Sequence, residues 1–225
     1  MTAELKTAQV IAIDGPAGAG KSSVSAQLAA RLGFMRLDTG ALYRAIGLAA
    51  LRASISPAES EELSELLEGL EVDQREGQVW LNGALEGVSL RTPEVSKAAS
   101  DFAALPSVRA RLLELQREIG ARRPCIVDGR DIGTVVFPDA PLKIYLTASS
   151  RARAERRLLE LQAAGIEQAL EEVQREIEAR DEQDMSREIA PLKRAEDART
   201  VDATALSLEE VVEACTALAR EVFGS

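Results

Sequence analysis

The sequence predicts an α/β protein in which helices cover both faces of a parallel β-sheet. Three observations support this fold class. Short apolar runs of strand length alternate with longer segments whose apolar residues recur at helical spacing. A glycine-rich loop joins the first of these runs to a helical segment. A single helix–hairpin–helix segment interrupts the alternation, which indicates an insertion into one compact unit of 225 residues rather than a second domain.

The first part of the chain contains a strand, the glycine-rich loop and two helices. Val10–Ile13 is a short apolar run that ends at a tight turn, Asp14-Gly15. Asp38-Thr39 can cap a second helix that runs to about Arg52. The first helix is marked by apolar residues every four positions and by a glycine stop signal, namely Val24, Leu28, Leu32 and Gly33.

The insertion is expected between about residues 60 and 103. Ser56–Glu59 offers a capping box with Pro57 at the first helical position, so we expect an acidic helix to begin there. Thr92-Pro93 caps another helix. Between them, two short strands and a two-residue turn indicate a hairpin formed by Gln78–Leu81, Asn82-Gly83 and Ala84–Val88.

The alternation resumes after the insertion. Strands are predicted at Cys125–Val127, Leu142–Leu146 and Thr200-Val201, with highly charged helices from Ser149 to about Glu182. A helix precedes the first of these strands, with the apolar stripe Val108, Leu112, Leu115 and Ile119. A helix closes the chain, with the stripe Leu208, Val211, Val212, Cys215, Leu218 and Val222.

Composition excludes several function classes. The chain has no histidine, which rules out Ser-His-Asp catalysis, imidazole acid/base catalysis and His-liganded zinc sites. Cys125 and Cys215 are far apart and are expected to be core residues in a reducing compartment. The net charge of −10 disfavours nucleic acid and membranes as partners. Residues 1–9 show no signal pattern and no run approaches a membrane span, so we expect a cytoplasmic protein.

The glycine-rich loop predicts binding of a nucleoside triphosphate. Its sequence GPAGAGKS matches GxxxxGK[ST] and lies between a strand and a helix, as this motif requires. Glycines let successive N–H groups point at phosphate oxygens, and the helix N-terminus adds a positive dipole end. Lys21 should reach the β- and γ-phosphates, and Ser22 should offer its hydroxyl to Mg²⁺. The predicted ATP-binding residues are Gly15, Pro16, Ala17, Gly18, Ala19, Gly20, Lys21, Ser22 and Ser23.

Other residues favour a small kinase among the classes that use a triphosphate. A GTPase would need an NKxD motif, whereas asparagine occurs only at Asn82. The segment Asp128-Gly129-Arg130-Asp131 directly follows a predicted strand, so Arg130 and Asp131 are expected at the sheet edge where ligands bind. A run of arginines is either a solvated helix face or a mobile lid over the phosphates, and comprises Arg151, Arg153, Arg156 and Arg157.

The chain resembles the bacterial cytidylate kinases nearly end to end. The matching segments are IAIDGPAGAGKSS, LDTGALYRA, LRTPEVSKAAS, VRARL, DGRDIGTVVFPDAPLKIYL and RDEQDMSREIAPL. The segment DGRDIGTVVFPDA is far more specific than the phosphate loop. The resemblance implies a P-loop nucleoside monophosphate kinase fold with a five-stranded parallel sheet, in a single unit. Its implied parts are a core of residues 1–59 and 104–225, a monophosphate-binding insertion at about 60–103 and a helical lid at about 150–190.

The resemblance also implies the reaction and its residues. Mg²⁺-ATP would phosphorylate CMP or dCMP to CDP or dCDP in pyrimidine nucleotide metabolism, and the protein would be a monomer. The implied acceptor-phosphate residues are Arg44 and Arg130, with Thr39 nearby. The implied cytosine residues are Ser100, Arg109, Asp131 and Arg187, and the implied sugar residues are Arg180 and Asp184. The implied catalytic residues are Lys21, Arg130, Arg156 and Arg157.

The chemistry of cytosine suits these residue types. Its amino donor beside a ring acceptor is complementary to a carboxylate paired with a guanidinium. Uracil presents a carbonyl instead, and each buried mismatch of this kind costs roughly 1–3 kcal/mol. Transfer to another small acceptor such as UMP or shikimate, and a non-enzymatic ATP-dependent switch, stay open as alternatives. A kinase of nucleic-acid ends is disfavoured by the acidic charge and by only seven aromatic residues.

Overall fold

A computed structural model describes residues 9–75 and 77–224, and their main sheet has five parallel strands in the order β2-β6-β1-β7-β8. This confirms the predicted fold class. The strands are β1 (Val10–Asp14), β2 (Met35–Asp38), β6 (Cys125–Gly129), β7 (Leu142–Thr147) and β8 (Arg199–Asp202). The alternation pattern did not mark β2, because MRLD is half polar and lies at the sheet edge.

Helices pack on both faces of this sheet because successive residues of the central strand point to opposite sides. Ile11 and Ile13 belong to one apolar core, with the helices α1 (Lys21–Leu32) and α8 (Leu208–Phe223). Val10 and Ala12 belong to the other core, with α2 (Thr39–Arg52) and α5 (Pro106–Arg122). Both cysteines are buried in these cores, as the sequence predicts.

The segment between α2 and α5 carries a second, three-stranded sheet. Its antiparallel strands are β3 (Val72–Arg75), β4 (Gln78–Leu81) and β5 (Ala84–Glu86). The predicted hairpin is confirmed, with positive φ at Asn82 and Gly83 in the turn. Strand β3 was not predicted, because its sequence VDQR is mostly polar. The flanking helices are α3 (Glu61–Gly69) and α4 (Pro93–Phe102), with a 3₁₀ turn at Val88–Arg91.

The predicted start of α3 is wrong by about one turn. The helix is capped by Ser60, whose hydroxyl accepts a hydrogen bond from the Leu63 N–H, so Ser56 is not its cap. Glu59 lies before the helix, and its carboxylate accepts a hydrogen bond from the Ser107 N–H at the start of α5. The capping box expected at Ser56–Glu59 therefore does not form, because Ser60 caps the helix and Glu59 contacts α5.

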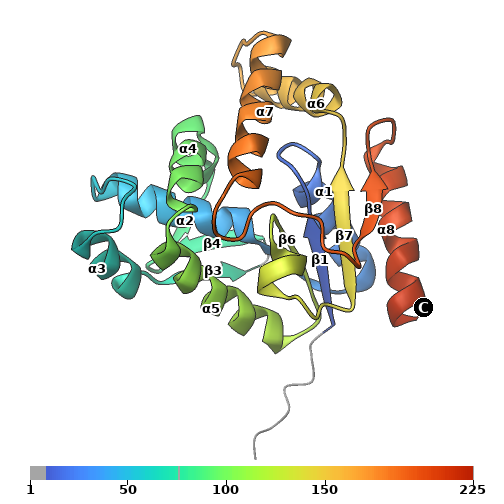
Figure 1. Cartoon of the computed structure of the whole chain (residues 1–225), viewed down its shortest axis with the longest axis horizontal. Helices are drawn as coiled ribbons and strands as arrows, with labels where there is room; N and C mark the ends of the chain where they lie inside the picture. Colours follow the sequence, from blue (N-terminus) through green and yellow to red (C-terminus); the bar gives the residue numbers. More distant parts are fainter. Residues whose placement is uncertain (1–8, 76, 225) are drawn as a thin grey trace, which may run out of the picture.

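Two charged helices stand at the carboxyl ends of the parallel strands (Figure 1). They are α6 (Ser150–Ala163) and α7 (Leu170–Met185). They pack on each other through a small apolar cluster of their own, formed by Ala154, Leu161, Val173 and Ile177 with Leu158 and Leu170 at its margin. Within the described ranges no helix is both long and apolar enough to cross a membrane.

Candidate functional site

The glycine-rich loop connects β1 to α1 at the carboxyl edge of the sheet. Gly15 lies so close to β7 that a Cβ there would be 1.9 Å from the Leu146 carbonyl oxygen, so no larger residue fits. Gly20 has φ 91° and is the N-cap of α1, which leaves the helix N-terminus open toward the loop. This is the geometry that a phosphate-binding loop requires.

Lys21 is buried inside this loop. Its Nζ donates hydrogen bonds to the carbonyl oxygens of Gly15 and Pro16, both at 2.7 Å. Burial lowers the pKa of Lys21 well below its ordinary value, and the nearby Arg130 guanidinium lowers it further. Asp128, Asp14 and Asp184 act in the opposite direction. A triphosphate bound to the loop would place negative charge next to the Lys21 ammonium group and stabilise its charged form.

Asp128, at the end of β6, faces the first turn of α1. The hydroxyl of Ser22 donates to its Oδ2 at 3.0 Å, and the hydroxyl of Ser25 donates to its Oδ1 at 2.6 Å. Burial and the neighbouring Asp38 raise the pKa of Asp128, and Arg36 opposes this. Ser22 and Asp128 thus bring two hard oxygen donors together beside the loop, which suits Mg²⁺.

Asp14, the last residue of β1, holds the segment that follows β6. Its carboxylate accepts hydrogen bonds from the N–H groups of Ile132 at 2.8 Å and Gly133 at 2.7 Å. Burial raises the pKa of Asp14 to about 6 despite these two bonds. The register pairs Asp14 with Gly129. This carboxylate therefore fixes the backbone immediately after Arg130 and Asp131.

Three predicted arginines, Arg130, Arg180 and Arg187, lie around the carboxylate of Asp184 in α7. Arg130 Nε donates to Asp184 Oδ2 at 2.6 Å, and Arg187 forms an ion pair with Oδ1 at 2.6 Å. Burial alone would raise the pKa of Asp184, but the two guanidinium groups lower it below its ordinary value. Burial and Arg130 lower the pKa of the neighbouring Arg180 to about 10. The cluster therefore holds more positive charge than Asp184 neutralises.

Two arginines of this cluster, and Arg44 near it, have guanidinium N–H groups without a partner among the described residues. The Nε atoms of Arg44, Arg180 and Arg187 are buried and have no hydrogen-bond partner among the described residues. Arg44 lies on α2 and makes an ion pair with Asp38 at 3.5 Å. Buried polar groups are normally paired. Unpaired guanidinium N–H groups from α2 and the end of α7 are what an anionic ligand such as a phosphate would satisfy.

A second buried pair lies beside the cluster. Arg109, on α5, donates a hydrogen bond to the Asp131 carboxylate, and both side chains are buried. Burial raises the pKa of Asp131, opposed by Arg109 and Arg187. Arg109 also donates to the Ala103 carbonyl oxygen just after α4, the helix that carries the buried Ser100. Arg109 and Asp131, which the resemblance implies as cytosine-binding residues, are therefore in contact with each other.

Thr39 occupies a different environment from these charged residues. Its side chain is buried at the start of α2, and its hydroxyl donates to the Asp128 carbonyl oxygen at 2.7 Å. A Cβ at Gly129 would lie 2.8 Å from the same hydroxyl. Thr39 thus links α2 to the end of β6.

The arginines of α6 do not all face the phosphate loop. Arg153 is buried against it, and its Nη1 donates to the Ala17 carbonyl oxygen at 2.8 Å. Arg156 donates to the Ala203 carbonyl oxygen after β8. Arg157 pairs with the exposed Glu160 at 2.9 Å, and Arg151 with Glu155 at 3.2 Å. In this structure Arg153 therefore contacts the phosphate loop, whereas Arg156 and Arg157 make other contacts. The catalytic role that the resemblance implies for Arg156 and Arg157 stays a prediction.

Sequence reasoning also missed Asp14, Asp128 and Asp181 as residues of the site. The strand ends were marked, but the sequence does not show that Asp128 lies beside Ser22, which depends on β6 being adjacent to β1. The positions of Asp14 and Asp128 in the sequence could have identified these two residues. Asp14 and Asp128 each directly follow a predicted apolar strand, as residues at a ligand-binding sheet edge do.

Known proteins are similar to this chain along most of its length. A family model described as cytidylate kinase matches residues 11–221. A cytidylate kinase of Thermotoga neapolitana is 49% identical over 212 residues, covering 94% of this chain and 96% of that protein. A cytidylate kinase of Desulfitobacterium hafniense is 49% identical over 206 residues, covering 90% of this chain and 89% of that protein.

A solved structure shares the fold at lower sequence similarity. A gluconokinase from Sinorhizobium meliloti superposes with a TM-score of 0.51 at 18% identity, covering 96% of this chain and 94% of that chain. At this identity the likeness bears on the fold alone.

Proposed function

The chain belongs to the cytidylate kinase family, and from this premise we propose how its site transfers the γ-phosphoryl group of ATP to CMP or dCMP. The roles of the residues are assigned from one observation: charged side chains at one edge of the sheet form a continuous series from Lys21 to Arg44. Lys21 interacts electrostatically with Arg130 and Asp184, and Arg180 interacts with Arg130, Asp184, Arg44 and Arg187. A triphosphate on the loop and a monophosphate on the arginines would therefore lie next to each other.

The transfer needs no general base. The attacking oxygen of a nucleoside monophosphate is already ionised at neutral pH, since the second phosphate pKa is about 6. Catalysis then consists of holding the two phosphates in line and stabilising the charge that develops between them. Lys21 binds the donor phosphates, and Arg130 lies between the donor and the acceptor. Arg44, whose buried Nε has no partner among the described residues, binds the acceptor phosphate together with Arg130. Arg180 and Asp184 hold the sugar hydroxyls.

Arg109 and Asp131 recognise the base. The carboxylate accepts from the cytosine amino group while the guanidinium donates to the ring nitrogen. Arg187 interacts electrostatically with Asp131 and supports the same site, and Ser100 supplies a hydroxyl from α4. Uracil would place a carbonyl against Asp131, which disfavours it.

Mg²⁺ would be held by Ser22 and Asp128 together with the phosphates of ATP. Both side chains provide hard oxygen donors, and they lie within hydrogen-bond distance of each other. When bound, the ion neutralises charge on the β- and γ-phosphates. The loop residues Gly15 to Ser23 keep their proposed role as the phosphate-binding segment.

Three parts of the chain have separate roles in this proposal. Residues 60–103 form the monophosphate-binding insertion, supported by their separate sheet, and residues 150–190 form the lid, supported by the apolar cluster shared by α6 and α7. The remaining residues form the core. We also propose a monomer that acts in the cytoplasm on ATP and CMP or dCMP, with no nucleic acid or membrane partner.

The test is ADP production from Mg²⁺-ATP with CMP, dCMP, UMP, AMP, GMP and shikimate in parallel. Turnover with CMP and dCMP far above the other acceptors is expected. Preference for another acceptor would retain the donor site and overturn the roles of Ser100, Arg109 and Asp131. Binding of ATP without turnover of any acceptor would favour a nucleotide-dependent switch.

A further inference from the structure

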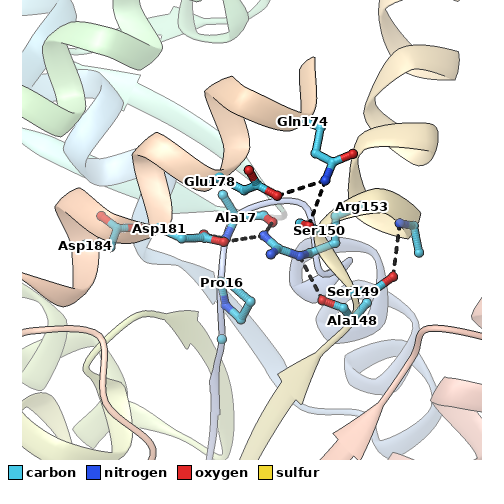
Figure 2. A network of polar contacts seen from close by, with 12 residues as sticks. Pro16, Ala17, Ala148, Ser149, Ser150, Arg153, Gln174, Glu178, Asp181 and Asp184 are labelled. Atoms are coloured by element: carbon cyan, nitrogen blue, oxygen red, sulfur yellow. Dashed lines mark hydrogen bonds and ion pairs between the residues drawn. The ribbon is translucent and has the colours of Figure 1, made fainter. Parts of the chain in front are cut away.

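Two residues of the lid hold one segment of the phosphate loop from both sides (Figure 2). The Ala17 N–H donates to Asp181 Oδ1 at 3.0 Å, and Arg153 Nη1 donates to the Ala17 carbonyl oxygen at 2.8 Å. Arg153 and Asp181 also form an ion pair at 2.6 Å. Arg153 Nε donates to the Ala148 carbonyl oxygen at 2.9 Å, which ties the same guanidinium to the end of β7.

This contact reaches Lys21 through one peptide group. The Pro16 carbonyl oxygen accepts from Lys21 Nζ at 2.7 Å, and the N–H of the same Pro16–Ala17 peptide donates to Asp181. Because a peptide group is planar, its carbonyl and N–H directions are fixed relative to each other. A rotation of this peptide would break both bonds. The position of α7 is therefore linked to the position of the Lys21 ammonium group.

The link is buried and specific. The side chains of Arg153 and Asp181 are only 7% and 8% exposed. Removing one partner of a buried ion pair leaves an uncompensated charge, which is strongly unfavourable. The close approach also depends on Gly18, where a Cβ would lie 3.3 Å from Arg153 Cβ.

Charge balance explains why the two residues occur together. A lone carboxylate beside the phosphate loop would repel a triphosphate, whereas the Arg153 guanidinium neutralises it locally. The apolar cluster of α6 and α7 contains residues of these two helices only. Polar contacts of Arg153 and Asp181 thus join this cluster to the loop.

We propose that Asp181 is a positioning residue that acts through Arg153 and the Pro16–Ala17 peptide to hold the lid helices on the phosphate loop. It sets the loop for ATP and limits the access of water to the donor phosphate without touching the nucleotide. This inference rests on the proposed kinase function for its consequence on turnover, but its effect on ATP binding is independent of any acceptor.

The main test is Asp181→Asn in the full-length protein, with ATP affinity measured by calorimetric titration in the presence of Mg²⁺. Asparagine keeps an oxygen for the Ala17 N–H but loses the charge that pairs with Arg153. We expect ATP to bind about tenfold more weakly, and hydrolysis of ATP to rise relative to transfer to CMP. The matched control is Glu182→Gln, which removes a charge from the next, exposed residue of α7 and should behave as wild type.

A double-mutant cycle separates a coupled pair from two independent effects. Arg153→Ala and Asp181→Asn should each weaken ATP binding, and the double variant should be little worse than either one. Additive effects, or ATP binding that is unchanged or tighter in Asp181→Asn, would overturn the proposal. If Asp181→Asn does not fold, Arg153→Lys makes the same prediction, since lysine keeps the charge but cannot make all three contacts of the guanidinium.

The outcome also separates this inference from the proposed function. Weaker ATP binding in the variants, combined with no acceptor turnover in the wild type, would support the positioning role and reject the kinase assignment. Normal turnover of CMP by the wild type, combined with unchanged ATP binding in the variants, would support the kinase assignment and reject the positioning role of Asp181.

Discussion

The Ser22 hydroxyl donates a hydrogen bond to Asp128 Oδ2 at 3.0 Å, although the two residues are 106 positions apart in the chain. The contact exists because β6 pairs with β1 and the two strands end together, with Ile13 opposite Asp128. The first turn of α1 and the end of β6 therefore face the same point beside the phosphate loop.

Replacing Ser22 by alanine should raise the Mg²⁺ concentration needed for half-maximal activity by about tenfold, because a hydroxyl ligand is lost. Titration of activity with Mg²⁺ at saturating ATP and CMP measures this. Ser25→Ala is the matched control. It removes the other hydroxyl that donates to Asp128, at 2.6 Å, but leaves Ser22 in place. An equal shift in both variants would assign the effect to the packing of Asp128 rather than to the metal.

Lys21→Ala should lower kcat/KM with CMP by at least about a hundredfold, because the ammonium group no longer stabilises the transferred charge. The melting temperature should change little, since two effects on folding oppose each other. Two buried hydrogen bonds to Gly15 and Pro16 are lost, but so is a buried charge whose pKa the fold lowers. Steady-state kinetics and thermal unfolding measure the two effects, and near-normal turnover would refute the donor site.

The fold was largely predictable from the sequence because apolar periodicity and turn chemistry act locally. The strand at Val10–Asp14, the phosphate loop and the Asn82-Gly83 turn all follow from adjacent residues. The strands β2 and β3 were missed because an edge strand and a half-exposed strand can be polar. The start of α3 was misplaced because Glu59 contacts α5 instead of capping the helix.

The site was predictable only in part, since its members come from distant segments. A motif identified Lys21, and the resemblance implied Arg109 and Asp131, which the structure brings into contact. Choosing among the arginines of α6 required the direction of each side chain, which follows from how α6 packs on α7. Arg153 contacts the loop because it lies on the inner side of the helix, next to Ala154 of the shared apolar cluster.

Asp131→Asn should reduce the preference for CMP over UMP by roughly tenfold or more, as expected for a buried mismatch of 1–3 kcal/mol. The amide no longer rejects the uracil carbonyl, and its ion pair with Arg109 is lost. The ratio of kcat/KM values for the two acceptors measures the effect. ATP affinity should be unchanged, which provides the internal control. An unchanged ratio would remove Asp131 from base recognition.

The stability of the protein should depend on pH through Asp14. Burial raises its pKa from 3.8 to about 6 in the folded protein, so the native state binds more protons than the unfolded chain between these values. The stability associated with protonated Asp14 is fully present below pH 3.8 and is lost as the pH rises through 6. The difference corresponds to about 3 kcal/mol.

Asp14→Asn provides the measurement, because asparagine does not titrate. The free energy of unfolding in urea should be compared for the two proteins from pH 4.5 to 7.5. Asparagine has one oxygen for the two N–H groups of Ile132 and Gly133, so the variant pays a cost that is independent of pH. In addition to this constant difference, the free energy of unfolding of the wild type should fall relative to that of the variant as the pH rises. A difference that stays constant across this range would mean that Asp14 is ionised throughout, and that its two backbone hydrogen bonds outweigh burial.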